Sequence, residues 1–447
     1  MSTAVYFIVS EIFAPFFLNV GAQMHKATGL KPAYFAFLPR DNRRLRQLHG
    51  DVFPRDVYSL DQVKINTSLF SVEEADQMLG FMMAKHGGDV TDWRARLYST
   101  ASYIDHYLDA NDVRLIVLWN GQDFVGRIFS LLGARRGIKT VFFENGYFPR
   151  TLQCDPCGVN SASSLSSVPF SEIRAVPKAE PSTADEPDLE MISFPPISRL
   201  DVWLSGLKKS LAPKYLKRFP EQRGSDWRVV RQLQRARQAV PMDQPDLPEH
   251  FVFVPLQVHD DTQVLLNCRH FDSVETFFHE AYKAIRAALP PGYPIVVKEH
   301  PEDLCRHDYD AIRQAYPDVI WLKKFNIDTL LERASMVVVI NSSVGLQAIA
   351  RKLPTVVFGE SFYTRDEIAF VVHDLAQAAE VVARAAQGLS GAMLADIDHF
   401  VAYLRNVHFI QGGWASPLPG TIVQTVRRLA WLAKSSPTQT PLVMPSA

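Results

Sequence analysis

The sequence has few cysteines and no long apolar run, and both shortages limit what the chain can be. Four cysteines among 447 residues do not make a disulfide framework, which favours a reducing, cytoplasmic environment. No uninterrupted run approaches the roughly 20 apolar residues of a membrane-spanning helix. The apolar start "MSTAVYFIVSEIFAPFFLNVG" lacks basic residues and is interrupted by Glu11 and Pro15, so we do not expect a signal peptide.

An excess of positive or negative charge is also missing, with 47 Lys and Arg against 48 Asp and Glu residues. The formal net charge is -1, so no global field attracts nucleic acid, and we expect no nucleic-acid partner. Hydrophobic residues make up 47% and charged residues 21%, an ordinary globular composition. The length allows two or three domains, each with its own core. The composition therefore predicts a soluble, multi-domain protein.

Continuous apolar runs alternate with a helical pattern in the first part of the chain. "AVYFIVS" (4–10), "VRLIVLWN" (113–120) and "KTVFFEN" (139–145) read as buried strands, and "GQDFVGRIFSLLGARRG" (121–137) has helical periodicity. Such alternation favours a parallel sheet covered on both faces. We therefore expect residues 1–175 to form a doubly wound α/β domain.

A stretch without clear periodicity follows at 176–245. Residues 176–196 are rich in Pro, Glu, Asp and Ser and read as a linker or excursion. "LSGLKKSLAPKYLKRF" (204–219) is basic and amphipathic. It is typical of a solvated helix packed on a domain, and the alternative is peripheral contact with the inner membrane.

The alternation resumes in residues 246–390, which we expect to form a second doubly wound domain. Five strand candidates are "HFVFVPLQ" (250–257), "YPIVVKEH" (293–300), "DVIWLKK" (318–324), "ASMVVVIN" (334–341) and "PTVVFGE" (354–360). Helical stretches in 391–434 are placed to pack back on the first domain, and 435–447 reads as a disordered tail. Two Rossmann-like domains facing a cleft define a GT-B-like α/β fold, which glycosyltransferases and nucleotide-sugar epimerases share.

One strand of the second domain ends in a pattern suited to an anion. "VVVINSSVGLQAIARK" (337–352) places Ser342 and Ser343 where a strand gives way to a helix. The N–H groups and positive dipole end of that helix favour a phosphate, and Gly345 lets the backbone come close. The alternative is that one serine only caps the helix.

Two more strands end in polar residues at the same sheet edge. "IVVKEHPED" (295–303) places His300 before Pro301, which turns the chain, so the histidine is a candidate phosphate donor or general acid. Lys298 is a weaker candidate because strand alternation points it away. "VPLQVHDDTQVL" (254–265) adds Gln257 and the pair Asp260-Asp261. We expect no metal, because a nucleoside monophosphate leaving group carries little charge to neutralise.

The segment "FFENGYFPRTLQCDPCGVN" (142–160) carries two carboxylates and a Cys-x-x-Cys pair. It does not open a helix after a first strand, as redox motifs do, and a zinc site would need Cys268, Cys305 or His270. We therefore expect spare buried thiols. Glu144 ends a buried strand and Asp155 lies in a loop, positions suited to acid/base or nucleophilic carboxylates. The alternatives are an arginine-paired or capping Glu144 and a turn-forming Asp155.

These motifs, in this order, resemble bacterial capsule polysaccharide biosynthesis proteins, and more narrowly the retaining β-Kdo glycosyltransferases that use CMP-Kdo. The similarity runs from about 119 to 363. It implies that the second domain holds CMP, with His300 and Ser342-Ser343 at cytidylate-binding positions and Gln257 in the adjoining motif. It also implies that Asp155 attacks the anomeric carbon, with Glu144 as acid/base partner or alternative nucleophile. The implied partners are a nucleotide-sugar donor, CMP-β-Kdo, and a growing surface polysaccharide or lipid-linked acceptor, with no other cofactor.

Three other functions fit the sequence. The first is an enzyme of the same fold with another nucleotide-sugar donor, for which a diphosphate would find only Lys298, Lys323 and Lys324 nearby. The second is a sugar-nucleotide epimerase, which needs no acceptor. The third is a non-catalytic capsule-assembly protein, in which substitution of Asp155 would leave activity intact.

Overall fold

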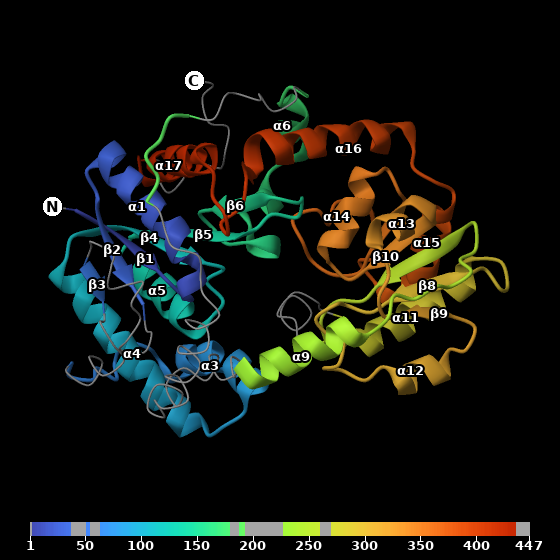
Figure 1. The fold of residues 1–447 in the computed structure, drawn as a ribbon, viewed down its shortest axis with the longest axis horizontal. Coiled ribbons are helices and arrows are strands. Elements are labelled where there is room, and N and C mark those ends of the chain that lie inside the picture. The colour runs from blue at the N-terminus through green and yellow to red at the C-terminus, as the bar shows by residue number, and fades with distance from the viewer. Residues whose placement is uncertain are drawn as a thin grey trace.

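The computed structural model describes residues 2–36, 51–53, 63–178, 187–192, 227–259 and 270–434. The basic stretch 204–219, Asp260-Asp261, the tail 435–447 and most of the 176–196 linker lie outside these residues. No helix in the described part of the chain is both long and apolar enough to span a membrane. Figure 1 shows two α/β units, one containing both the first and the last helices of the described chain.

A seven-stranded sheet forms the first unit, because the apolar runs near the N-terminus become neighbouring strands. Its order is β13-β6-β5-β4-β1-β2-β3, parallel except that β6 runs antiparallel to β5 and β13. The strands are β1 (Thr3–Phe7), β2 (Lys31–Phe35), β3 (Asp51–Phe53), β4 (Val113–Trp119), β5 (Lys139–Asn145), β6 (Thr151–Asp155) and β13 (Ile410–Gln411).

Helices cover both faces of this sheet, as expected for buried parallel strands. One face packs on α3 (Val72–His86), α4 (Val90–Ala110) and α5 (Phe124–Arg135). The other packs on α1 (Ala14–Thr28) and α17 (Pro419–Lys434), which contact each other. The C-terminal segment thus completes the first unit with the edge strand β13 and with α17, which lies beside α1 in Figure 1.

A six-stranded, fully parallel sheet forms the second unit, in the order β12-β11-β10-β7-β8-β9. The five strands expected from the sequence are present, and β12 was not anticipated. They are β7 (Phe251–Pro255), β8 (Ile295–Lys298), β9 (Ile320–Leu322), β10 (Ala334–Val339), β11 (Thr355–Val357) and β12 (Phe370–Val371).

Helices again lie on both faces of the second sheet. One core includes α13 (Ile327–Arg333), α14 (Ser343–Ala350), α16 (Gly391–Tyr403) and α6 (Phe170–Ala175). The opposite core includes α11 (Val274–Ala288) and α15 (Ala378–Ala386), with α12 (Asp310–Ala315) at its edge. Helix α9 (Trp227–Ala239) ends beside the loops after β8 and β9, where Arg237 donates to the carbonyl oxygens of Glu302 and Leu304.

The segment after β6 packs with the second unit, although the sequence groups residues up to 175 with the first. Leu165 and Ile173 are fully buried in the core that also contains α14 and α16. Arg365 of the second unit donates to the carbonyl oxygens of Leu165 and Val168. The structural boundary therefore falls between Asp155 and Leu165. Two doubly wound units meeting along this boundary make the fold GT-B-like, as predicted.

Candidate functional site

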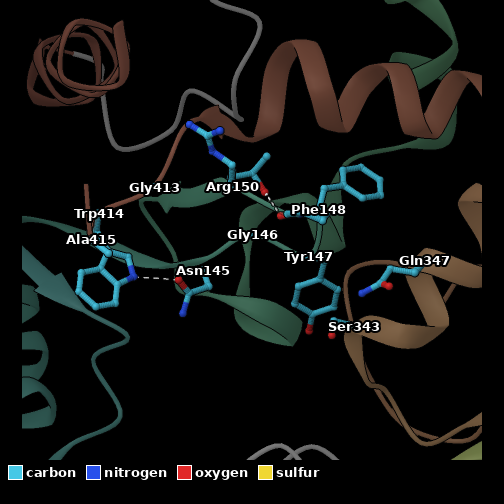
Figure 2. Close-up of a pocket in the computed structure, with 12 residues that line it drawn as sticks. Asn145, Gly146, Tyr147, Phe148, Arg150, Ser343, Gln347, Gly413, Trp414 and Ala415 are labelled. Atoms are coloured by element: carbon cyan, nitrogen blue, oxygen red, sulfur yellow. Dashed lines mark hydrogen bonds between the residues drawn. The ribbon is translucent and has the colours of Figure 1, made fainter. Parts of the chain in front are cut away.

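A pocket of about 390 Å³ lies where the two units meet. The first unit supplies the β5–β6 turn (Asn145–Thr151) and the segment Gly413–Ala415, and the second supplies Ser343 and Gln347 of α14. Figure 2 shows Tyr147 extending from the β5–β6 turn toward Ser343. The pocket therefore lies between the carboxyl end of β5 in the first sheet and the start of α14, the helix that follows β10 of the second sheet.

Local hydrogen bonds fix the β5–β6 turn. Gly146 N donates to Thr151 O at 2.8 Å, and Thr151 Oγ1 donates to Phe148 O at 2.7 Å. Glycine is required at 146, because a Cβ there would lie 1.9 Å from Thr151 Oγ1. Arg150 has a left-handed φ of 56°, which tightens the end of the turn.

Aromatic contacts connect this turn to both units. The Tyr147 ring lies 4.9 Å from that of Phe362 and 6.0 Å from that of Tyr363, both on the second unit. On the other side, Trp414 Nε1 donates to Asn145 Oδ1 at 2.9 Å (Figure 2). Sequence reasoning did not single out Asn145, Tyr147 or Trp414. The first two lie in the quoted motif, but no local pattern pairs Trp414 with it.

Glu144 stands beside the pocket at the carboxyl end of β5, as the sequence predicts. Its Oε2 accepts from Asn120 Nδ2 at 2.7 Å, and its Oε1 accepts from Asn145 N at 2.7 Å. Asn120 follows β4 with a left-handed φ of 59°, which turns its side chain back toward β5. The carboxylate is partly exposed and held in one orientation, and such a carboxylate can act as an acid, a base or a nucleophile.

Asp155 occupies a different environment from the predicted loop. It is the last residue of β6 and has 0% exposure. Its Oδ1 accepts from the backbone N–H groups of Cys157 and Ser164, and its Oδ2 accepts from the hydroxyls of Ser163 and Ser164. In this conformation the carboxylate organises the turn after β6. Attack on a sugar by Asp155 therefore requires that turn to open.

The cysteine pair is split between two environments. Cys154 is buried, and burial raises the pKa of its thiol to about 12. Cys157 is exposed, contrary to the expectation of two buried thiols, and partial burial of its sulfur still raises its pKa. Neither thiol is activated as a nucleophile. The described residues contain no group of three or more His, Cys, Asp or Glu side chains placed to hold a metal.

The first turn of α14 is available for an anion. Ser342 occupies the N-cap position with extended backbone, yet its side chain accepts no cap hydrogen bond. Its Oγ is buried and has no hydrogen-bond partner among the described residues. The alternative that a serine caps this helix is therefore wrong for the Ser342 side chain. Gly345 is needed for packing, because a Cβ there would lie 2.6 Å from Tyr363 Oη, which donates to Ser342 O at 2.7 Å.

Gln257 holds the α14 turn in place and does not line the pocket. Its Nε2 donates to Asn341 Oδ1 at 2.9 Å, and its Oε1 accepts from Asn341 N at 3.1 Å. Both residues are buried. The reciprocal pair ties the exit of β7 to the exit of β10, immediately before Ser342. Gln257 is thus a positioning residue in this structure.

The residues after β8 lie at the same sheet edge, outside the pocket lining. Lys298 is buried, its Nζ donates to Glu299 O at 3.1 Å, and burial lowers its pKa. His300 is partly exposed, and its Nδ1 accepts from Glu302 N at 3.1 Å, which places the proton of the neutral ring on Nε2. Pro301 is exposed. The order β10-β7-β8 places these residues two strands away from Ser342.

Fold and pocket together define a two-domain α/β protein with a pocket between its domains, in the region where α/β proteins of this kind commonly bind ligands. Residues 114–405 match the family model described as capsule polysaccharide biosynthesis protein. That span is more than half of the chain, and the protein belongs to this family.

The individual relatives share only about a quarter of their aligned residues with this chain. The chain is 27% identical to Protein FixF of Sinorhizobium fredii over 309 residues, covering 68% of this chain and 62% of that protein. It is 24% identical to the capsule polysaccharide export protein KpsS of Escherichia coli, covering 51% of this chain and 62% of that protein. The chain thus spans less than two thirds of the curated relatives' length. Among solved structures it is similar to the KpsC β-Kdo 2,7 transferase of Thermosulfurimonas dismutans, with 13% identity, a TM-score of 0.39, and coverage of 97% and 100% of the two chains.

Proposed function

We propose that the chain is a glycosyltransferase of capsule-type polysaccharide biosynthesis that takes its sugar from a nucleotide donor. The observation that carries this proposal is the pocket between the units. Its lining includes Ser343 at the uncapped start of α14 on one unit and Asn145 on the other. Asn145 is the sequence neighbour of Glu144 and donates its backbone N–H to that carboxylate. A transferase needs these two functions together, an anion site for the leaving group and a carboxylate near the reacting carbon.

The phosphate of the donor binds at α14. The Ser343 and Val344 N–H groups, the Ser342 hydroxyl and the positive helix end favour a negative charge there. The family resemblance adds His300, which lies at the exit of β8 and outside the pocket lining, as a further phosphate ligand. A nucleoside monophosphate leaving group matches this limited set of donors better than a diphosphate does, which favours CMP-β-Kdo as the donor. The same argument predicts that transfer needs no metal or other cofactor.

The sugar is transferred with retention through a carboxylate adduct. In the first displacement a carboxylate oxygen attacks the anomeric carbon, and the electron pair of the carbon–phosphate oxygen bond leaves with CMP. In the second, the acceptor hydroxyl replaces the carboxylate, and a base takes its proton. Family resemblance assigns attack to Asp155, with Glu144 as acid/base partner. The geometry makes Glu144 the better-placed carboxylate until the turn after Asp155 opens.

The acceptor is a growing surface polysaccharide or a lipid-linked glycan, and it enters from the first unit. The pocket face of that unit carries Tyr147, Phe148 and Trp414, and aromatic faces of this kind suit sugar rings. Peripheral contact of residues 204–219 with the inner membrane stays a prediction, because these residues lie outside the described part of the chain.

The test is intact-protein mass spectrometry of the 447-residue chain mixed with CMP-Kdo generated in situ. We expect an added mass of one Kdo on the wild type and none on the variant lacking the nucleophile. Asp155→Ala and Glu144→Gln are compared, with the exposed Glu380→Gln as the control. Peptide mapping then locates the adduct on Asp155 or on Glu144.

Each alternative gives a different result. Nucleotide release only from a uridine diphosphate sugar identifies another donor, and an inverted free sugar without transfer identifies an epimerase. Full cellular activity of Asp155→Ala and Glu144→Gln, with no turnover of any donor, identifies a non-catalytic assembly protein.

A further inference from the structure

Two histidine rings are stacked beyond the carboxyl ends of β7 and β8. His259 and His307 lie 4.4 Å apart between ring centroids, with 15° between their planes. Each ring is held by its own carboxylate: His259 Nδ1 bonds Asp303 Oδ1 at 2.7 Å, and His307 Nε2 bonds Glu275. Both side chains are 27% exposed. The stack is therefore ordered and open to solvent.

Asp303 fixes the orientation of His259 completely. Its carboxylate is 0% exposed and also accepts from His259 N at 2.9 Å and from Tyr309 Oη at 2.8 Å. The ring nitrogen facing a carboxylate carries the proton, so Nδ1 of His259 is the donor to Asp303. The other nitrogen, Nε2, lies on the opposite side of the ring and is directed away from Asp303. Such a buried carboxylate–histidine pair presents one ring nitrogen in a defined direction.

The backbone that leads to His259 lies next to the proposed donor site. Two residues earlier, Gln257 is bonded to Asn341, the neighbour of Ser342. Asp303 itself closes the turn after His300, because Asp303 N donates to His300 O at 3.0 Å. The exit of β7 is thus tied on one side to the α14 turn and on the other to the His300 turn. His259 stands between the two elements assigned to the phosphate.

We propose that His259 binds the donor phosphate through Nε2 and that Asp303 is the residue that positions it. This inference rests on the proposed function, because it places a further ligand on the same nucleotide. When the bond between the anomeric carbon and the phosphate oxygen breaks, its electron pair stays on that oxygen. The doubly protonated ring can bridge Asp303 and this anion, because it donates from Nδ1 to the carboxylate and from Nε2 to the phosphate oxygen.

The titratable groups around His259 come from two elements, the segment after β8 and helix α11. Asp303 and Tyr309 lie after β8, and His307 stacks on the ring from the same segment. Glu275 of α11 holds His307 from the far side. His307 is the natural comparison, because it shares the stack and the exposure of His259 but directs its bonded nitrogen to Glu275.

The experiment measures binding of CMP and of cytidine to the full chain by titration calorimetry. CMP and cytidine differ only in the phosphate, so their difference isolates a phosphate contact from any general damage. We compare the wild type with His259→Ala, His259→Asn and Asp303→Asn, and use His307→Asn as the matched control. Thermal unfolding of each variant verifies that it is folded. The asparagine at 259, whose amide can replace Nδ1 but does not reach the position of Nε2, serves if the alanine variant is not folded.

We expect His259→Ala to weaken CMP binding about tenfold or more while cytidine binding changes less than about twofold. Asp303→Asn should shift CMP binding in the same direction, and His307→Asn should leave it near the wild-type value. A parallel loss for CMP and cytidine, or unchanged CMP binding, overturns the assignment of His259.

UMP, UDP and uridine are titrated as well, which separates this inference from the proposed donor. If the wild type binds a uridine nucleotide and not CMP, the CMP-Kdo donor is wrong, and the same comparison with uridine decides the role of His259. If the wild type binds none of these nucleotides, the proposed function and this inference both fail.

Discussion

The indole of Trp414 donates its Nε1–H to the side-chain oxygen of Asn145 at 2.9 Å, across 269 residues of sequence. Asn145 in turn donates its backbone N–H to Glu144 Oε1. The ring of Trp414 also packs 4.5 Å from that of Phe13. The C-terminal segment thereby fixes the position of a residue next to the candidate catalytic carboxylate.

Trp414→Phe should lower the rate of nucleotide release more than it lowers stability. Phenylalanine keeps the contact with Phe13 but cannot donate to Asn145, so the bond worth about 1 kcal/mol is lost beside the pocket. Trp93→Phe is the matched control, since it removes an equivalent indole bond, to Gly87 O at 2.9 Å, away from the pocket. Steady-state rates and urea unfolding are measured for both. Equal loss of rate in the two variants would contradict a positioning role for Trp414.

Gly345→Ala should destabilise the protein by about 1–3 kcal/mol and weaken nucleotide binding. The added Cβ would lie 2.6 Å from Tyr363 Oη and 2.9 Å from Val339 Cγ2, so the start of α14 must shift. Gly80→Ala is the control, because Gly80 is also inside a helix but exposed, with nothing within 4 Å of its Cβ position. That change should be neutral or stabilising by up to about 1 kcal/mol. Urea midpoints at pH 7 decide, and a Gly345→Ala protein as stable as Gly80→Ala would refute the packing argument.

Asp155→Asn should lower the free energy of unfolding by about 2–4 kcal/mol, because an amide cannot accept all the donors that surround this carboxylate. Glu144→Gln, at a partly exposed position, should cost less than about 1 kcal/mol. Denaturant unfolding of the two variants provides the comparison. Similar stabilities would show that the turn after β6 does not depend on the Asp155 carboxylate.

His408 should make stability fall on mild acidification. The ring is fully buried, and this burial lowers its pKa from 6.5 to about 4, with the nearby Asp155 charge opposing the shift. Because the unfolded chain takes up the proton first, stability is complete above pH 6.5 and decreases as the pH falls from 6.5 toward 4. The loss between pH 7 and pH 5 is about 2 kcal/mol for this group.

His408→Phe isolates that contribution, because it keeps an aromatic ring beside Phe362 and removes the titration. Unfolding free energies at pH 7 and pH 5 are compared with those of the wild type. Asp123, whose buried carboxyl has its pKa raised to about 6, acts in the opposite direction in both proteins and cancels in the comparison. An unchanged pH dependence in His408→Phe would contradict a neutral, buried His408.

The strands that could be predicted from the sequence are those formed by a short, continuous apolar run. β4 and β5 appear at the expected places, and so do all five expected strands of the second unit. β6 was read as a loop, since Pro149, Pro156 and Gly158 enclose it. It is a strand because an antiparallel turn returns it to β5, where Gln153 pairs with Glu144.

Prediction of the site was less complete for a different physical reason. Ser342, Ser343 and Glu144 could be singled out from the sequence because strand ends mark the ligand-binding edge of such sheets, and their roles stay predictions. Whether Asp155 is exposed depends on how Ser163 and Ser164 fold back onto it, and whether Trp414 reaches Asn145 depends on a contact between distant segments. Neither relation leaves a periodic signal. The Asp303–His259 pair is likewise formed by two loops that the sequence separates by 44 residues.

Two of the places where the chain passes between the units, after Asp155 and before Ile410, are neighbours, because Ile410 pairs with Leu152 of β6. The segment 187–192 also packs on the first unit, where Ile192 N donates to Asn19 Oδ1 at 2.7 Å. The two units are therefore joined by more than one passage of the chain. Multiple connections of this kind restrict how one unit can shift against the other, so opening and closing around a substrate would return Ser343 to its place opposite Tyr147.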